Sequence, residues 1–418
     1  MSRAVPRSLR SRQPVAAVAL LALALSRLAS AQTPVATPPP LTYDAALQLA
    51  LTRNLELQAA RRQQAIREGA IRTARQFPNP DLSFEAARDT PHQTLLLNLP
   101  VELFGQRGRR IDLAKEELSL AGVDVQTAER LVRRELHRSF YSVMATDERL
   151  RLVEDALQLA RRIRDTAQAQ FDAGAVPRLD VLQADLVVTR AETELDAVRS
   201  DRASARADLN AVLDWPPQQP FALAGGLDDH LDSPPYERAL DLAATSNVEL
   251  VSLDRQIAVE QRRLNLLRAE RNPTPVFTFG GDFNSDAFAA GPRGGVALTI
   301  PLFSRNQGEV AASLATTLQL RAQRDAIRRT VDNSVFAVVS RIEAARRRLD
   351  AFRTRLVPTA TSLESLAEDS YRLGRSSVLS LVEAQRSLHD VRLEALQAAL
   401  DLQLALAELE EIIGTPLP

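Results

Sequence analysis

A chain of 418 residues with no cysteine excludes a disulfide framework, a thiolate metal site and a cysteine nucleophile. Its 52 basic and 53 acidic residues give a formal net charge of −1, which argues against nucleic acid as a partner. Aromatic residues make up only 4% of the chain, and the apolar 45% is dominated by Ala and Leu, a composition that suits long packed helices.

The first 31 residues have the pattern of a secretory signal segment. Four arginines precede an apolar run at 15–25, which is too short to span a membrane as a helix. Ala29-Ser30-Ala31 then forms a small-x-small cleavage site, so we expect a mature chain that starts at Gln32. An uncleaved anchor is the alternative. Residues 32–40 form a Pro/Thr linker that we expect to be extended.

Helical periodicity begins near Leu41 and runs to about Gln76, where Phe77-Pro78-Asn79-Pro80 stops it. Two alternating apolar runs follow over about 81–101, each roughly eight to ten residues long, which is the length that a tilted strand needs to cross a bilayer. The residues of the second run that share one face are Leu95, Leu97, Leu99 and Val101. The pattern predicts a hairpin of two membrane-length strands.

An unbroken helical pattern then covers Arg109 to about Asp172, with apolar residues at steps of three and four. At 1.5 Å per residue this is a rod of roughly 95 Å, so we expect a coiled coil or a bundle. Gly174 is suited to end this helix with a positive φ, and Pro177 suits the first turn of the next helix, which runs to about Leu213. The rod and the following helix therefore predict a helical hairpin.

The same order of elements then returns, which indicates one architecture built twice. The first structural repeat is expected at 41–217, a connection at 218–235 and the second repeat at 236–418. The second strand pair is expected at about 276–302, with a polar, Gly-rich loop at 284–293.

The second rod begins near Gly308, carries a heptad seam, and should bend at Pro358. Its tip, residues 371–384, returns 200 positions after residues 171–184. Both copies have an aromatic residue three positions before the tip glycine. A last helix to Ile413 ends the repeat.

Four strands per chain are too few to close a barrel, which needs about eight or more. An open sheet edge in lipid leaves N–H and C=O groups without partners, so several chains would have to pool their strands. A dimer gives eight strands and a trimer twelve, and the strand count alone does not choose between them.

The duplicated order of helix, strand pair, long helix, glycine tip and helix resembles the TolC family of outer-membrane efflux proteins over essentially all of the mature chain. The motifs that carry the resemblance are residues 43–56, Pro78-Asn79-Pro80, residues 101–108 and the two tips. Pro-Asn-Pro followed by Glu-Leu-x-Gly-x-Arg at 102–107 is most similar to the CzcC-like branch, which serves heavy-metal and cation efflux.

The resemblance implies a mainly α fold with a small membrane β part. Three chains would form a twelve-stranded β-barrel in the outer membrane, continued by an α-helical tunnel in the periplasm. The chain would be a passive exit duct of a tripartite efflux system for heavy-metal cations, with drugs or small organic molecules as the alternative cargo. The implied partners are two further copies of the chain, a periplasmic adaptor protein, an inner-membrane pump of the resistance-nodulation-division type and outer-membrane lipid.

A soluble periplasmic coiled-coil adaptor is the competing function from another class. Such a scaffold would not need two duplicated strand hairpins of bilayer length. The strand pairs therefore favour the duct.

The resemblance also assigns roles at the tips. Asp180 matches the family's acid in the first tip, Tyr371 matches its constriction tyrosine, and Glu383 keeps an acid near the second tip. Ser376 and Ser380 stand where drug-efflux relatives carry an arginine and an acid, which puts the drug-type Asp–Arg latch in doubt. The expected gate residues are Asp180, Tyr371, Ser380 and Glu383. The residues expected to contact the adaptor are Gly174, Ala175, Val176, Gly374, Arg375 and Ser376.

Arg107, Arg109 and Arg110 stand where a strand becomes a helix. Positive charge at a helix start opposes the helix macrodipole. From their position alone, these side chains are either solvated or in contact with phosphate headgroups at the membrane interface.

The sequence has no Gly-x-Ser-x-Gly, His-Glu-x-x-His or P-loop motif, so we expect no enzymatic activity and no cofactor. No two of its four histidines have metal-ligand spacing, so we expect no high-affinity metal site. A cation duct does not need one, because tight binding would slow passage.

Overall fold

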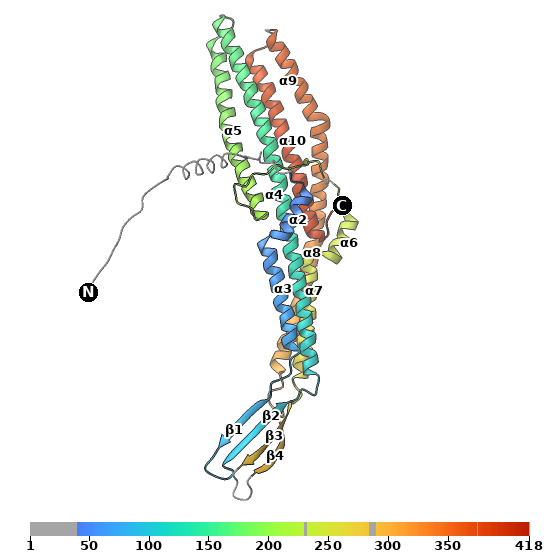
Figure 1. The fold of residues 1–418 in the computed structure, drawn as a ribbon. Helices are drawn as coiled ribbons and strands as arrows, with labels where there is room; N and C mark the ends of the chain where they lie inside the picture. The colour runs from blue at the N-terminus through green and yellow to red at the C-terminus, as the bar shows by residue number, and fades with distance from the viewer. Residues whose placement is uncertain (1–39, 230–231, 284–289, 374, 418) are drawn as a thin grey trace, which may run out of the picture. The chain divides into compact units, whose positions relative to one another are not determined.

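The computed structural model describes residues 40–229, 232–283, 290–373 and 375–417. The chain divides into two units, Met1–Pro40 and Leu41–Pro418, and the fold described here is that of the second. The expected signal segment, 1–31, and all but the last residue of the expected linker lie outside the described residues. In the second unit, long helices carry a sheet at one end and two helical tips at the other (Figure 1).

The elements of the first repeat are α2 (Tyr43–Arg53), α3 (Leu55–Ala74), β1 (Asp81–Ala86), β2 (Gln93–Pro100), α4 (Gln106–Asp172) and α5 (Arg178–Val212). Those of the second are α6 (Tyr236–Ser246), α7 (Val248–Ala269), β3 (Pro275–Phe283), β4 (Ala290–Leu298), α8 (Gln307–Ala351), η1 (Phe352–Leu356), α9 (Val357–Arg372) and α10 (Val378–Ile413). None of the helices within the described ranges combines the length and the apolar composition needed to cross a membrane.

The prediction of a single helix over 41–76 was wrong, because the chain forms two helices there, α2 and α3, with Asn54 between them. The Asn54 side-chain oxygen accepts a hydrogen bond from the N–H of Leu57 at 3.0 Å. Asn247 divides α6 from α7 in the same way and accepts from Glu249 and Leu250. An asparagine side chain can satisfy the free N–H groups of a helix start, so the chain can turn here without losing those bonds.

The two rods differ in regularity. Helix α4 is a single helix of 67 residues, whereas the second rod passes from α8 through the π-helical turn η1 into α9. In η1 the N–H of Val357 reaches back five residues to the carbonyl of Phe352. Pro358 follows, and its ring would clash with the carbonyl four residues earlier in a regular helix. The wider turn relieves that clash, so the rod is irregular over 352–356, directly before the proline at which a bend is expected.

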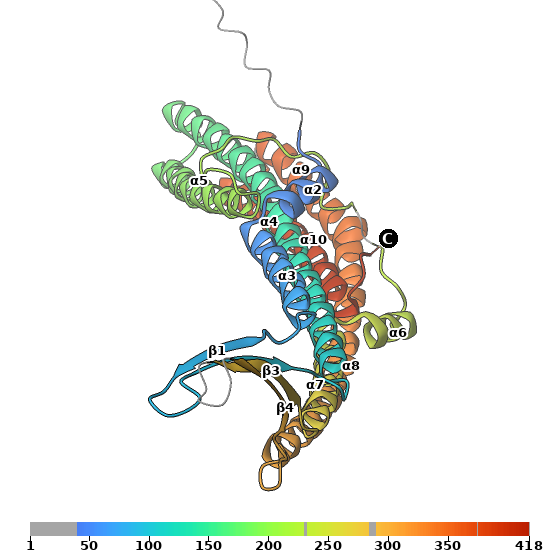
Figure 2. The same ribbon diagram turned by 60° about the horizontal axis from the view of Figure 1, so that its bottom comes forward.

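The sheet has the strand order β1-β2-β3-β4 (Figure 1), and every neighbouring pair is antiparallel. Figure 2 shows the same sheet with this end of the molecule turned forward and β1, β3 and β4 labelled. The β2–β3 pairing, with Asn98 opposite Thr278, joins the two repeats. Strand β1 has only 6 residues and is shorter than expected, while β2, β3 and β4 have 8, 9 and 9. Residues 284–289 of the expected polar loop lie outside the described residues, and its last four residues, 290–293, belong to β4. The expected end of the second strand pair at about 302 was wrong, because β4 ends at Leu298.

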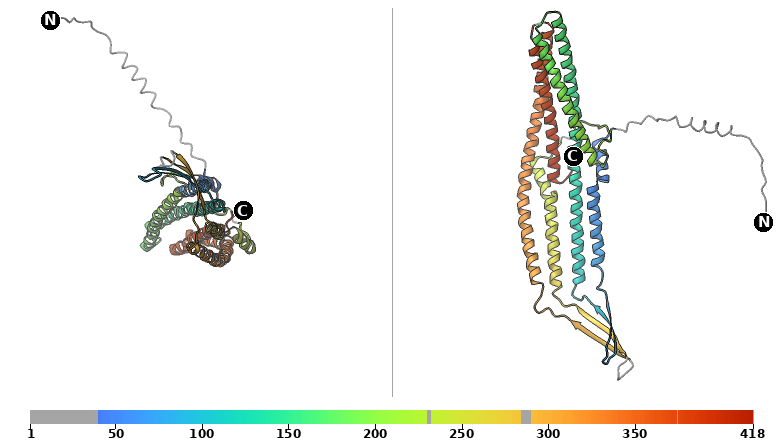
Figure 3. Two further views of the ribbon diagram at one scale, coloured as in Figure 1. Left: turned by 90° about the horizontal axis from the view of Figure 1, so that it is seen from below. Right: turned by 90° about the vertical axis from the view of Figure 1, so that its left-hand side faces the viewer.

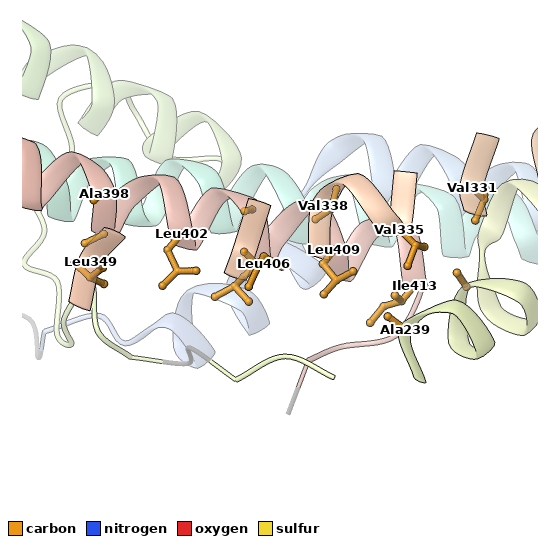
Figure 4. Close-up of a cluster of buried hydrophobic side chains, with 14 of the residues drawn as sticks. Ala239, Val331, Val335, Val338, Leu349, Ala398, Leu402, Leu406, Leu409 and Ile413 are labelled. Atoms are coloured by element: carbon orange, nitrogen blue, oxygen red, sulfur yellow. The ribbon is translucent and has the colours of Figure 1, made fainter. Parts of the chain in front are cut away.

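Next to the sheet, the helices stand in the lateral order α3, α4, α7 and α8 (Figure 3, right). Toward the tips, α5 packs on α4, and α9 packs on α10. The predicted heptad seam of the second rod is buried at Val331, Val335, Val338 and Ile342, where it packs against α6 and α10 (Figure 4).

Buried groups tie the connection between the repeats to the long helices. The side-chain amide of Gln403, on α10, donates to the carbonyls of Leu227 and Asp229 at 3.0 and 2.6 Å. Asn210, on α5, donates to the carbonyls of Pro217 and Gln219 at 2.9 and 3.2 Å. These bonds satisfy loop carbonyls and hold the connection across both helical hairpins.

Candidate functional site

The four-stranded sheet has one apolar and one polar face. Cross-strand partners lie on the same face, and successive residues of a strand alternate between faces. Leu82, Leu97 and Phe279 form one row across three strands, and Asp81, Asn98 and Thr278 form the adjacent row. The exposed residues of the apolar face are Leu82, Phe84, Leu95, Leu97, Leu99, Phe279, Phe283, Val296 and Leu298. Leu95, Leu97 and Leu99 thus share a face as predicted, while Val101 lies beyond the end of β2.

Hydrogen bonds between side chains connect the strands on the polar face. Thr94 donates to the carboxylate of Asp282 at 2.9 Å, and Thr278 donates to the side-chain oxygen of Asn98 at 2.8 Å. Arg293 also reaches Asp282, at 3.3 Å. One side of the sheet is therefore suited to water and the other to lipid.

At the opposite end, α4 closes with the predicted glycine turn. Gly174 has φ 71°, and its N–H donates to the carbonyl of Phe171 at 2.9 Å. The N–H of Ala175 donates to the carbonyl of Gln170 at 2.8 Å, which completes a Schellman motif. In the second tip Arg375 donates in the same way to Ser370 at 2.9 Å, while Gly374 itself lies outside the described residues.

The outgoing helices begin with different caps. Pro177 is the N-cap of α5 and stands just before its first turn rather than within it. The equivalent Ser377 caps α10 and accepts from the N–H of Ser380, whose own hydroxyl donates to the Ser377 carbonyl at 2.7 Å. Ser380, an expected gate residue, is therefore part of a helix cap. Val176 and Ser376 are both half-buried, and the Ser376 hydroxyl is buried and has no hydrogen-bond partner among the described residues.

Tyr371 joins the two tips. Its side chain is only 7% exposed and packs among Ile163, Ala167, Val181 and Leu381, which come from both hairpins. Its hydroxyl donates to the side-chain oxygen of Gln170 at 3.0 Å. Burial raises the pKa of Tyr371, and the negative charge of Asp180 raises it further.

The structure thus brings two of the expected gate residues together. Asp180 lies half-buried in the first turn of α5 and acts electrostatically on Tyr371, whereas Glu383 is exposed along α10. Sequence reasoning missed Gln170, because the bond to Tyr371 depends on the packing of two hairpins far apart in the chain. Below the tips, a cavity of about 500 Å³ separates the hairpins, and His389 on α10 lies 3.6 Å from Glu194 on α5 at its wall.

At the sheet end, the arginines at the start of α4 contact the end of α3. Arg107 donates to the carbonyl of Arg75 at 2.8 Å, and its guanidinium lies 4.2 Å from the ring centre of Phe77. Arg110 forms a two-pronged ion pair with Glu102 at 2.7 and 3.1 Å, which raises the pKa of Arg110.

Arg110 also donates to the carbonyls of Ala74 and Gln76 at 3.3 and 3.2 Å. The last carbonyls of a helix lack internal partners and carry partial negative charge, so these arginines complement the end of α3. Arg109 is exposed. The sequence showed three cations at a helix start but not the helix end that two of them contact.

Across the described ranges, no group of three or more His, Asp or Glu side chains is arranged to hold a metal ion.

Comparison with known proteins gives three results. A family model described as outer membrane efflux protein matches residues 46–213 and 239–415. The chain is 28% identical to the cobalt-zinc-cadmium resistance protein CzcC of Cupriavidus metallidurans over 380 residues, which are 90% of each chain. It is 27% identical to the nickel-cobalt-cadmium resistance protein NccC of Alcaligenes xylosoxydans xylosoxydans over 82% of this chain and 78% of that one.

Among solved structures, the fold is similar to CusC, whose crystal structures were described in terms of folding and transmembrane channel formation. The TM-score is 0.75 at 16% identity, over 93% of this chain and 99% of the other. At that identity the likeness concerns the fold.

Proposed function

Because the chain belongs to the outer membrane efflux protein family, we propose that it is the exit duct of a tripartite efflux system whose cargo is heavy-metal cations. Membership makes the chain an outer-membrane efflux channel with a periplasmic helical extension, and a transport protein rather than an enzyme. It also removes the soluble periplasmic scaffold as an alternative. The channels of this family form trimers within tripartite systems.

The main observation in support of a duct is that the amphipathic sheet has two open edges. Strands β1 and β4 each pair on one side only within the described chain. In lipid their free N–H and C=O groups need partners, which β1 of one copy and β4 of the next supply to each other. Three copies then close a barrel of twelve strands, with the apolar face toward lipid and the polar face toward the lumen.

The lateral edges of the helical part support the same assembly. Helix α5 exposes Leu179, Leu182 and Leu186, and α9 exposes Leu363 and Leu366. These residues recur at helical spacing on the two outer helices of the tip half. Stripes of exposed leucine on opposite edges suit a ring in which α9 of one copy covers α5 of the next.

Two features support cations as the cargo. The two resistance proteins reported above carry cobalt, zinc, cadmium and nickel in their names. The polar face of the sheet carries three carboxylates, Asp81, Glu85 and Asp282, against one arginine, Arg293, which pairs with Asp282. The tips carry Asp180 and Glu383. Rings of carboxylates along a pore favour cations.

The tips form the gate in this proposal. Asp180 and Tyr371 stand at the constriction, Ser380 fixes the start of α10, and Glu383 adds a carboxylate farther along it. The turns at Gly174, Ala175 and Val176 and at Gly374, Arg375 and Ser376 meet the periplasmic adaptor, which links the duct to an inner-membrane resistance-nodulation-division pump.

Single-channel recording tests the gate. Tyr371→Ala should raise conductance, and Asp180→Asn with Glu383→Gln should move the reversal potential toward that of a non-selective pore. Glu343→Gln on α8, far from the tips, is the matched control. A reversal potential unchanged by removing both tip carboxylates would contradict the assignment.

Deletion of the gene in its host tests the cargo. Loss of the duct should lower tolerance to zinc, cobalt and cadmium and raise their cellular content, without changing tolerance to organic dyes. The wild-type gene should restore tolerance. If deletion instead raised the cellular content of dyes and left metal tolerance unchanged, the cargo of the duct would be small organic molecules.

A further inference from the structure

The passage from strand to long helix occurs twice in this chain and has the same local build each time. A left-handed residue, Gly105 with φ 80° or Asn306 with φ 54°, precedes the first helical residue, Gln106 or Gln307. The glutamine side-chain oxygen then accepts from a backbone N–H two residues earlier, at 3.0 Å in the first junction and 2.7 Å in the second. The two junctions can therefore be compared residue by residue.

They differ in what covers them. Gln106 is only 3% exposed, because the end of α7 and the start of β3 lie against it. Its side-chain amide donates to the carbonyl of Asn272 at 3.5 Å, and the N–H of Val101 donates to the carbonyl of Pro275 at 2.9 Å.

The second junction lies on the outer edge of the chain. Gln307 is exposed, and its amide turns back to the carbonyl of Phe303 at 3.0 Å. Leu302, the counterpart of Val101, is exposed, and Phe303 is 91% exposed. Phe303 is the most exposed large apolar side chain in the described part of the chain. Its apolar side chains are therefore exposed, because no element of the described chain covers this junction as α7 and β3 cover the first one.

On the opposite edge of the chain, the α3–β1 junction matches the α7–β3 junction in sequence spacing. Phe77 and Pro80 follow the last residue of α3, Ala74, by the same intervals at which Asn272 and Pro275 follow the last residue of α7, Ala269. Phe77 is 69% exposed. Beside it lies an open groove of about 590 Å³, whose lining includes Ala70, Ala74, Phe77, Pro78, Leu113 and Ala114.

We propose that the second junction of each copy docks on the α3–β1 junction of the next copy and reproduces there the contact that the first junction makes with α7 and β3. The Gln307 amide then donates to the carbonyl of Phe77, and the Leu302 N–H donates to the carbonyl of Pro80. Leu302 and Phe303 are covered by Phe77, Pro78 and the apolar groove. The occupant is a second copy of this chain, and the inference rests on the proposed trimeric duct.

Ring closure supplies the geometry for this contact. Within one copy, the lateral order α3, α4, α7 and α8 places the strand-to-helix junction of α4 beside the helix-to-strand junction of α7. In a head-to-tail ring, α8 is followed by α3 of the next copy, so the same two kinds of junction meet again. The Phe303 ring and the apolar groove are then removed from water at a single step.

Cysteine cross-linking tests the contact, because the chain contains no native cysteine. The variant with Gln307→Cys and Phe77→Cys is treated in detergent with a short bis-maleimide. It should give covalent dimers and trimers on a denaturing gel. The variant with Gln106→Cys and Asn272→Cys should link within one chain and stay at the monomer mass. Each single substitution, and Gln307→Cys with Phe171→Cys at the opposite end, should give no covalent oligomer.

Analytical ultracentrifugation of the same samples separates this inference from the proposed duct. Trimers in which the internal pair links but the Gln307/Phe77 pair does not would overturn the junction contact and leave the trimer standing. A wild-type protein that stays monomeric in a conducting state would overturn both. If the variant with Gln307→Cys and Phe77→Cys does not assemble, the variant with Phe303→Cys and Pro78→Cys replaces it. Its cross-linking is then judged by the same criteria.

Discussion

The central core of the first repeat contains a cluster of aromatic rings, whereas the buried core of the second is aliphatic apart from Phe352. In the first, the rings of Tyr43, Phe140 and Tyr141 pack with centroid separations of 5.6 to 6.0 Å. In the second, Val335, Val338, Ile342, Leu402 and Leu406 fill the corresponding space (Figure 4). The duplicated helices keep their order, and different side chains fill the gaps between them.

The two repeats can also be compared at equivalent positions, 200 residues apart. Leu209 and Leu409, 200 positions apart, are both fully buried, and Asp214 and Gly414 both have a positive φ. Yet Phe171 is 37% exposed where its counterpart Tyr371 is 7% exposed and bonded to the first repeat. Duplication therefore conserves backbone turns, while packing gives equivalent positions different tasks.

The largest expected effect lies in the two cores. Phe140→Ala should lower the free energy of unfolding by about 3–5 kcal/mol, because the ring is 1% exposed and leaves a cavity that aromatic neighbours cannot fill. Leu406→Ala in the aliphatic core should cost about 2–5 kcal/mol, toward the lower end because smaller side chains surround it. Denaturant unfolding of the detergent-solubilised protein measures both. A loss below about 1 kcal/mol for Phe140→Ala would show that this core is loosely packed.

Proline in the two rods should have unequal effects. Gln158 is exposed in the regular part of α4, 200 positions before Pro358. Gln158→Pro should cost about 3 kcal/mol or more, since it removes a hydrogen bond and meets the carbonyl four residues earlier. Pro358→Ala should cost little, because η1 already accommodates the ring. Circular dichroism and melting temperature check both, and an equal loss in the two rods would contradict the relief assigned to η1.

The tip aromatics should differ by one hydrogen bond. Tyr371→Phe removes the bond to Gln170 and leaves that amide oxygen unpaired, which should cost about 0.5–1.5 kcal/mol. Phe171→Tyr, on an exposed ring, should be neutral. The two variants are compared by thermal unfolding, and an unchanged Tyr371→Phe variant would show that the bond does not hold the tips together.

The smallest expected effect concerns Glu410, which stands 200 positions after the buried Asn210. Burial raises the pKa of Glu410 above its ordinary 4.5, and Arg133 only partly offsets this. A carboxyl group whose pKa is raised by folding stabilises the fold below pH 4.5, and this contribution is lost as the pH rises through the raised pKa.

Glu410→Gln should therefore raise the melting temperature at pH 7 and have little effect near pH 4. The control for loss of a carboxylate is Asp208→Asn. Asp208 lies on α5, two residues before Asn210. A melting-temperature difference that is independent of pH would contradict the role of Glu410 ionisation.

The local patterns of the sequence determined the kind of each element and much of the order. Steps of three and four residues predicted both rods, and the tip glycine predicted the turn after α4. Alternation predicted the first strand pair, and the repeated order of elements predicted the second, although β4 begins within the expected polar loop. These signals depend on neighbours within a few residues, where backbone geometry allows few choices. Asn54 and Asn247 also carried a local cap signal, which the continuous periodicity around them concealed.

Tertiary structure alone decided which distant groups meet. The pairing of β2 with β3, the contact of Arg110 with the end of α3, and the bond from Tyr371 to Gln170 join segments that carry no sequence mark of one another. Each depends on the rotation and offset of packed helices, and a shift of one residue turns a side chain by about 100° around its helix. The sequence placed Asp180 and Tyr371 in the tips, but only the packing of the two hairpins brought them together, because side-chain direction is set by how whole helices fit against each other.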